Sequence, residues 1–232
     1  LRVEPCGNGA EWKMQLLVQV TDGPETRKKL ESNLFAWGNN THGQLSLPPA
    51  EAEHAVVADP IAIFLSSALT GVAQVACGSA HTLLLTENGD LLAFGDNQFG
   101  QLGSDEPGSG PFSVKLPGLD NADESGKKVK QIACAARASF AIVTDGTHDE
   151  LYAWGDSSHG VLGLGNAVMK DFPTVREPLQ VEFGSPQLKV DHISAGDDHC
   201  AAVMASGELF AWGSNACGQL GLNDISVRTT PT

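Results

Sequence analysis

One short pattern occurs four times along the chain and constrains the fold more than any other feature. It reads LFAWGNNTHGQLSL at residues 34–47, and it returns at residues 91–104, 151–164 and 209–222. The aromatic-glycine pairs inside it begin at Trp37, Phe94, Trp154 and Trp212, with spacings of 57, 60 and 58 residues. Self-similarity at a nearly constant period predicts a repeat architecture, in which each unit is one module packed against its neighbours.

Each unit holds the same succession of apolar runs and turns. A small-residue step such as Cys77-Gly78 is followed by an apolar run, a turn dipeptide and a second apolar run that ends in the aromatic-glycine pair. The turn is Asn88-Gly89 in one unit and Ser206-Gly207 in another, and glycine supplies the positive φ that a two-residue hairpin needs. Four strands in about 60 residues without helical periodicity predict an all-β fold, a β-propeller of four-stranded antiparallel blades.

The period also predicts the domain organisation. We expect about four blades in a single, partial propeller domain covering residues 1–232, with approximate repeat units 1–59, 60–117, 118–178 and 179–232. Residues 227–231, VRTTP, look like the start of a further unit. The turn at Asp145-Gly146 stands three residues farther from its aromatic residue than the other two turns do. Because insertions at hairpin tips extend loops without moving the strands, we expect a longer loop there.

The charge distribution argues against nucleic-acid binding. The formal net charge is −14, and no lysine or arginine lies between Leu30 and Val114, where nine carboxylates occur. Such a stretch would repel a phosphate backbone, and its field favours a basic protein partner instead. We therefore expect no direct nucleic-acid partner.

Cysteine content and hydropathy indicate an intracellular protein. The five cysteines form no C-x-x-C pair, and their odd number does not fit a complete disulfide framework. No basic leader precedes an apolar core, and no apolar run reaches 18 residues. We expect a cytoplasmic or nuclear location and no membrane partner.

Candidate catalytic chemistry is sparse. The most reactive stretch is Asp197-Asp198-His199-Cys200, but adjacent residues of a strand point to opposite faces, so His199 and Cys200 are poorly placed as a base and a nucleophile. No phosphate loop, paired-carboxylate site or metal-ligand spacing stands out, and the Gly-x-Gly within LGLGN lacks the strand and helix of a dinucleotide site. We expect no catalytic residues, no metal and no cofactor, and hence no enzyme of bond chemistry.

The combined pattern resembles the repeat of the regulator of chromosome condensation family. The elements that carry the resemblance are G-x-x-H, an apolar run, Asp-Gly or Asn-Gly, and L-x-A-W-G-x-N-x-x-G-Q-L-G, over essentially the whole chain. The resemblance implies a seven-bladed propeller, of which this chain would hold about four blades. In the guanine-nucleotide exchange member of the family, the turn within G-x-x-H helps to form the face that engages the small GTPase Ran, with acidic and histidine residues there.

Carried over to this sequence, the resemblance places Asp197, Asp198 and His199 in the turn of the third full copy. The corresponding residues are Ser79, Ala80 and His81 in the first copy and Ala136, Arg137 and Ala138 in the second. The acidic turn and its histidine, together with His81, are therefore candidates for partner binding. The alternative role of the two histidines is a hydrogen bond that braces adjacent blades.

Two basic clusters are further candidates. Arg27, Lys28 and Lys29 form the first, and Lys127, Lys128 and Lys130 form the second, in the connection that spans residues 120–130. We expect both on protruding loops, where they either contact a partner or are simply solvated.

Two functions of different classes remain open. The first is a protein-interaction scaffold or adaptor, favoured by the composition and by the two turns that lack acidic residues. The second is a guanine-nucleotide exchange factor for a small Ran-like GTPase, which displaces nucleotide and Mg²⁺ without making or breaking bonds in a substrate. In both cases the expected partner is another protein.

Overall fold

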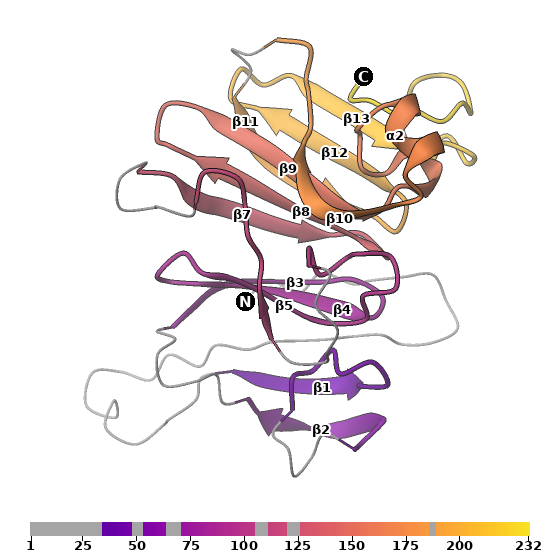
Figure 1. Ribbon diagram of the computed structural model, residues 1–232. Helices are drawn as coiled ribbons and strands as arrows, with labels where there is room; N and C mark the ends of the chain where they lie inside the picture. The colour runs from indigo at the N-terminus through magenta and orange to yellow at the C-terminus, as the bar shows by residue number, and fades with distance from the viewer. Residues whose placement is uncertain (1–33, 48–52, 64–70, 105–110, 120–125, 186–188) are drawn as a thin grey trace.

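The computed structural model describes residues 34–47, 53–63, 71–104, 111–119, 126–185 and 189–232, which form four antiparallel sheets (Figure 1). The first sheet pairs β1 (Phe35–Asn39) with β2 (Val56–Ala62). The second contains β3 (Val72–Cys77), β4 (His81–Thr86), β5 (Leu91–Gly95) and β6 (Phe112–Ser113). The third contains β7 (Lys128–Cys134), β8 (Ala138–Thr144), β9 (Asp149–Asp156) and β10 (Thr174–Gln180). The fourth contains β11 (Val190–Ala195), β12 (His199–Met204) and β13 (Leu209–Gly213).

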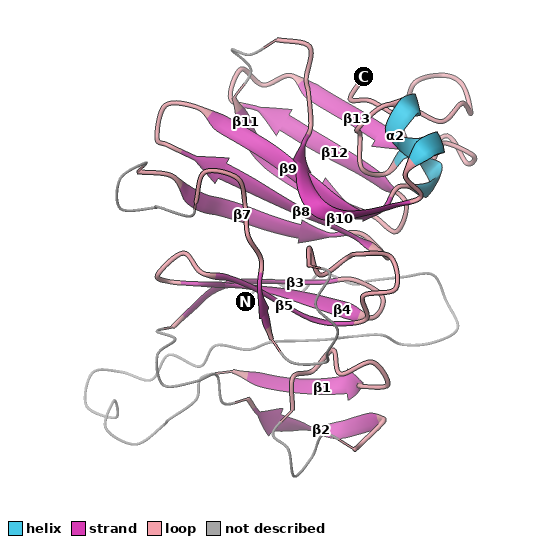
Figure 2. Cartoon of the chain, in the orientation of Figure 1, coloured by secondary structure: helices cyan, strands magenta, loops and turns pink. Residues whose placement is uncertain are grey.

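The predicted all-β propeller architecture is confirmed. The four sheets follow one another along the chain, and within each sheet the strands are joined in sequence order (Figures 1 and 2). Besides strands, the described residues include a 3₁₀ turn, η1 (Ser158–Gly160), and a six-residue helix, α2 (Asn166–Asp171). No helix in this part of the chain is long and apolar enough to cross a membrane.

The aromatic-glycine pairs occupy equivalent places. Phe94, Trp154 and Trp212 lie near the ends of β5, β9 and β13, the third strands of their sheets, and Trp37 lies in β1. β1 is therefore the third strand of its repeat unit. The residues before it, 1–33, fall outside the described part of the chain.

The segment predicted to begin a further unit instead completes the fourth sheet. Gly213 pairs with Arg228, and Ala211 and Thr232 exchange two backbone hydrogen bonds of 3.0 and 3.2 Å. Residues 228–232 thus run along the outer edge of β13. The prediction for residues 227–231 was wrong because an outer strand, which pairs on one side only, carries a weaker apolar pattern than the inner strands.

The polar residues after the aromatic-glycine pair fold into a self-contained loop, which in three of the four units carries an asparagine and a glutamine; the third sheet has Ser157 and Val161 instead. The side-chain oxygen of the asparagine accepts the N–H of the leucine five residues later, as in Asn97 with Leu102 (3.0 Å) and Asn215 with Leu220 (3.0 Å). The glutamine of the motif accepts a backbone N–H two residues before itself, as Gln101 does from Phe99 (2.8 Å). The repeated Asn and Gln therefore satisfy the backbone where the chain leaves the sheet.

This loop also joins each sheet to the next. The backbone carbonyl of Gln101 accepts hydrogen bonds from Trp154 Nε1 (3.0 Å) and Ser139 Oγ (2.7 Å), both in the third sheet. The carbonyl of Val161 likewise accepts Trp212 Nε1 (2.8 Å) from the fourth sheet. Glycine is needed beside the indole, since a Cβ at Gly163 would lie 2.9 Å from Trp212 Nε1. We call this arrangement the carbonyl clamp.

Inner strands are linked as well. Gln74 Oε1 accepts the N–H of Ile132 (2.9 Å), and Gln131 both donates to the carbonyl of Ile193 (2.8 Å) and accepts its N–H (3.1 Å).

Apolar side chains fill the space between the sheets. Leu151, for example, is 1% exposed against the fourth sheet, whereas its repeat equivalent Leu209, on the outer side of that last described sheet, is 66% exposed.

The second basic cluster does not lie on a protruding loop. Lys128 and Lys130 belong to β7. Lys127 forms an ion pair with Glu150 (2.7 Å), and Lys130 pairs with Asp149 (2.9 Å) and Asp191 (3.3 Å). The prediction was wrong because the strand begins inside the basic run, where Lys127 and Lys130 pair with acidic residues of the sheets. The first cluster, Arg27 to Lys29, lies outside the described residues.

The carbonyl clamp predicts the effect of Trp154→Phe. Phe94 occupies the equivalent position, so phenylalanine suits the packing, and the substitution mainly removes the donor to the Gln101 carbonyl. We expect the free energy of unfolding to fall by about 1–2 kcal/mol, because a buried acceptor loses one of its two partners. Urea denaturation measures this change, and a loss below about 0.3 kcal/mol would show that the clamp contributes nothing.

Candidate protein-interaction face

The two ends of the sheets form two different faces. One end carries the turns that join the first and second strands, and also the loops that follow the aromatic-glycine pairs. In Figure 1 this end lies on the right, near α2. The other end carries the hairpins between the second and third strands and the connections between sheets. We call the first the turn face and the second the hairpin face.

The three G-x-x-H-type turns have one geometry. Each is closed by a backbone hydrogen bond between its first and fourth residues: Gly78 to His81 (2.9 Å), Ala135 to Ala138 (2.8 Å) and Gly196 to His199 (2.9 Å). The third residue's carbonyl accepts the N–H that follows the aromatic-glycine pair, as Asp198 does from Ser214 (2.8 Å). The backbone of each turn is therefore fixed independently of its side chains.

Neighbouring turns are bonded to each other in a row. The N–H of Ser79 donates to the carbonyl of Ala136 (2.9 Å), and the N–H of Ala136 donates to the carbonyl of Asp197 (3.0 Å). Their second and third residues thus stand side by side on the turn face: Ser79-Ala80, then Ala136-Arg137, then Asp197-Asp198. A rigid backbone row presents a neutral, a basic and an acidic turn in that order.

The acidic turn is accessible. Asp197 is exposed, and the side chains of Asp198 and His199 are 44% and 36% exposed, with His199 Nδ1 3.7 Å from Asp198 Oδ1. Cys200 points into the interior, where its thiol lies 3.6 Å from the carbonyl of Val161. Burial raises the pKa of Cys200 well above its usual value, so the thiol stays protonated at neutral pH and is a poor nucleophile.

His81 lies in the interior. The residue is 0% exposed, and its Nε2 lies 2.9 Å from Ser139 Oγ of the next sheet. Burial lowers the pKa of His81 to about 4, although the nearby Asp96 carboxylate acts in the opposite direction. His81 therefore joins two sheets as a neutral imidazole and offers no surface to a partner.

The basic turn contains a contact that sequence reasoning missed. The guanidinium of Arg137 lies 4.5 Å from the ring centroid of Phe99, which belongs to the loop of the preceding sheet. Asp156 Oδ2 is 4.0 Å from the same side chain, which remains 58% exposed. Stacking on an aromatic face and a nearby carboxylate hold an arginine in place without hiding its charge. The signal in the sequence was an aromatic residue and an arginine at variable positions of two neighbouring units, Phe99 in the loop of one and Arg137 in the turn of the next.

Metal-ligating side chains do not cluster in the described part of the chain. Among the described residues, no group of three or more histidines, cysteines or carboxylates is placed to hold a metal ion. The face presents exposed charged side chains on a hydrogen-bonded backbone.

Family models match most of the described chain. Models of the Regulator of chromosome condensation (RCC1) repeat match residues 31–85, 88–142 and 148–203, and a second form of the repeat matches residues 72–101 and 190–219. These spans include the turns, the loops and all four aromatic-glycine pairs.

Curated relatives share this region. The human E3 ubiquitin-protein ligase HERC2 is 34% identical over 204 residues, which is 86% of this chain and 4% of the ligase. The secretion-regulating guanine nucleotide exchange factor of Bos taurus is 35% identical over 192 residues, covering 82% of this chain and 38% of that protein. The chain therefore spans well under half the length of these relatives.

Solved structures show the same fold. Human WBSCR16 superposes with a TM-score of 0.69 at 24% identity, covering 87% of this chain and 48% of that one. Yeast Prp20p, in a crystal structure reported with its binding properties to Gsp1p and histones, gives a TM-score of 0.67 at 24% identity, covering 86% and 45%.

The burial of His81 predicts a pH dependence of stability. Its folded-state pKa of about 4 lies below the usual 6.5, so between these pH values the unfolded chain binds a proton that the native chain does not. The contribution of His81 is complete above about pH 7 and is lost as the pH falls toward 4. When the pH is lowered from 7 to 5, the free energy of unfolding of the wild type should therefore fall by about 2 kcal/mol more than that of His81→Gln.

Denaturant titrations at the two pH values measure the difference. Ser139→Ala is the control, because it removes the hydrogen-bond partner and keeps the imidazole, and so should retain the wild-type pH slope. Equal slopes for His81→Gln and the wild type would contradict a buried, neutral His81.

Proposed function

Because this chain belongs to the Regulator of chromosome condensation (RCC1) repeat family, we propose that it is a protein-interaction propeller, an adaptor or scaffold that recognises a partner through its turn face. The observation that carries the proposal is the row of turns. Backbone hydrogen bonds hold three turns side by side, while their side chains change from Ser-Ala to Ala-Arg to Asp-Asp. Variable side chains on a constant, rigid support are typical of a recognition surface.

The charges suggest the chemistry of the partner. A face with Asp197 and Asp198 next to Arg137 fits a surface that carries a basic group beside an acidic one. The net charge of −14 would steer a predominantly basic protein toward the chain. We place the protein in the cytoplasm or nucleus, as one partial propeller domain that acts without bond chemistry and without direct nucleic-acid contact.

Guanine-nucleotide exchange on a small GTPase is the second candidate. It is favoured by the acid-acid-histidine turn at residues 197–199 and by a relative named as a guanine nucleotide exchange factor. Only one of the three described turns carries the acids, which makes recognition without exchange the better supported function. A fluorescent-nucleotide release assay against a panel of purified small GTPases separates the two, since an adaptor leaves the release rate unchanged.

Neutralising the acidic turn should reduce partner binding without unfolding the protein. We expect Asp197→Asn with Asp198→Asn to slow association about three- to tenfold at low salt and to flatten its salt dependence. The matched control is Glu87→Gln with Glu208→Gln, which removes two exposed charges from the hairpin face. Quantitative mass spectrometry compares the partners captured by the wild type and by both variants. For each partner that still binds, the association rate is then measured as a function of salt concentration.

Thermal melting of both variants completes the experiment. The proposal requires that the turn variant loses at least one partner which the hairpin-face variant keeps, at nearly the wild-type melting temperature. If the turn variant melts much lower with unchanged partners, the turn is structural and the interaction face lies elsewhere.

A further inference from the structure

A cavity of about 300 Å³ opens on the hairpin face, away from the turn face. One side is the start of β9 and the hairpin before it, residues 147–151. The other side is the connection that follows β10, residues 180–185, together with Lys189. Its apolar lining includes Leu151, Val181 and Phe183, and its acidic lining includes Asp149 and Glu182.

The cavity depends on the longer hairpin of the third sheet. β5 and β13 begin at Leu91 and Leu209, the repeat equivalents of Leu151, whereas β9 begins two residues earlier at Asp149. The ladder continues to the pair Thr144 and Asp149. Asp149 is therefore an extra strand residue, present in the third sheet and absent from the equivalent strands β5 and β13.

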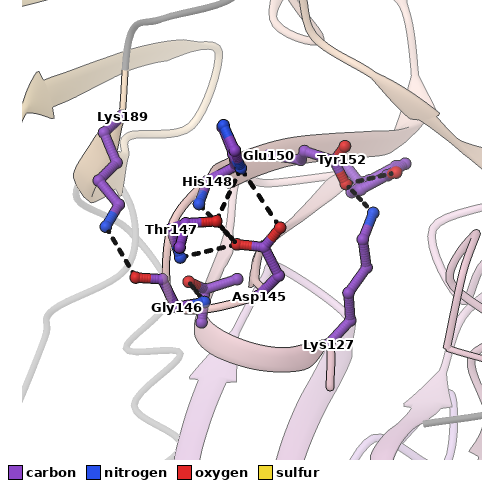
Figure 3. A network of polar contacts seen from close by, with 9 residues as sticks. Lys127, Asp145, Gly146, Thr147, His148, Glu150, Tyr152 and Lys189 are labelled. Carbon is purple, nitrogen blue, oxygen red and sulfur yellow. Dashed lines mark hydrogen bonds and ion pairs between the residues drawn. The ribbon is translucent and has the colours of Figure 1, made fainter. Parts of the chain in front are cut away.

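The hairpin holds a fixed shape. Asp145 Oδ1 accepts hydrogen bonds from the N–H of Thr147 (2.7 Å) and of His148 (2.6 Å), and also from Thr147 Oγ1 (2.7 Å) (Figure 3). These hydrogen bonds lower the pKa of Asp145 well below its usual range, and the backbone N–H of His148 has the largest effect. The carboxylate therefore stays ionised. Lys189 Nζ donates to the carbonyl of Gly146 (3.2 Å) and so ties the opposite wall to the hairpin.

The connection on the other side is anchored too. The ring of Phe183 packs edge-on against Phe210 and Trp212, with ring centroids 5.5 and 5.9 Å apart. The N–H of Val181 donates to the carbonyl of Leu151 (2.8 Å). The cavity is thus preformed between two supported segments, as small binding sites generally are.

Asp149 provides the polar feature that selects a ligand. Its side chain is 3% exposed, and Oδ2 accepts a hydrogen bond from Lys130 Nζ (2.9 Å). Its other oxygen, Oδ1, is buried and accepts no hydrogen bond from the residues that the structure describes. A buried carboxylate oxygen without a donor is costly, and a charged N–H donor gives it the strongest partner.

We infer that this cavity binds an arginine side chain of a partner protein. The aliphatic stem of the arginine packs on Leu151, Val181 and Phe183, as long cationic side chains do on apolar surfaces. The guanidinium donates to Asp149 Oδ1 and to the carboxylate of Glu182. Its several N–H groups in one plane suit two separate acceptors better than the compact ammonium of lysine. This site is independent of the turn face and of the function proposed for it.

Nuclear magnetic resonance titration of the 15N-labelled, 232-residue chain tests the inference. The probe is the acetylated, amidated tripeptide Gly-Arg-Gly, and the comparison probe replaces arginine by citrulline, which has nearly the same shape without the charge. We expect saturable shifts of the amides of residues 146–151 and 181–185. Binding of the arginine peptide should be about tenfold tighter than that of the citrulline peptide, as one charge-assisted hydrogen bond implies.

Two variants and one further probe make the test specific. Asp149→Asn and, separately, the exposed Glu182→Gln should each weaken the arginine peptide several-fold, while Glu208→Gln in the neighbouring hairpin should leave its affinity unchanged. Because Asp149→Asn could disturb Lys130, Glu182→Gln keeps the test decisive if the first variant fails to fold. Equal affinity for both peptides, shifts elsewhere only, or tighter binding of free L-arginine than of the peptide would overturn the inference.

Discussion

The carbonyl clamp between neighbouring sheets is the interaction on which the rest of the structure depends. A strand packs its apolar side chains against the next sheet without a fixed register, because hydrophobic contact is not directional. A carbonyl that receives two donors from the next sheet, as Gln101 does from Trp154 and Ser139, sets the distance and the angle between the sheets. Once these are fixed, the turns at the same end meet in a row and can bond to each other.

The clamp also explains why the turn side chains can differ between the repeat units. The side chains of the second and third turn residues take no part in the clamp. The clamp consists of a loop carbonyl with the tryptophan and serine donors of the next sheet, as Trp154 and Ser139 show. The turn backbone is closed by its own hydrogen bonds. Side chains such as Arg137 and Asp198 can therefore change without altering the backbone of the turn, so the charge pattern of the face can differ between units. The longer hairpin of the third sheet shows the same freedom at the opposite face.

Local pattern predicted the fold well but did not resolve contacts between sheets. The period, the Asn-Gly turn and the aromatic-glycine pairs each specify backbone within one unit, so the blades and their order followed directly. The outer strand at residues 228–232 was missed, because a strand paired on one side has little periodicity. The lysines at positions 127–130 were placed on a loop, since Glu150 and Asp191, which pair with Lys127 and Lys130, are distant in sequence.

Some features of the candidate site could likewise be predicted from the sequence, and others depended on contacts between sheets. Asp197 and Asp198 could be found from the sequence, because variation at one place in a repeat is visible without a structure. The inward position of His81 and the stacking of Arg137 on Phe99 needed the neighbouring sheet. The cavity beside Asp149 was also invisible, although the extra hairpin residues that form it could be counted.

Native-state amide hydrogen exchange at Ala136 tests most directly whether the sheets lock the turns into one row. This N–H lies at the surface end of the sheet and donates to the carbonyl of Asp197 in the next unit. The account predicts exchange on the order of a thousandfold slower than for an unprotected amide, with clear acceleration in Trp212→Phe, which weakens the clamp to the fourth sheet. Exchange at the unprotected rate in the wild-type protein would contradict it.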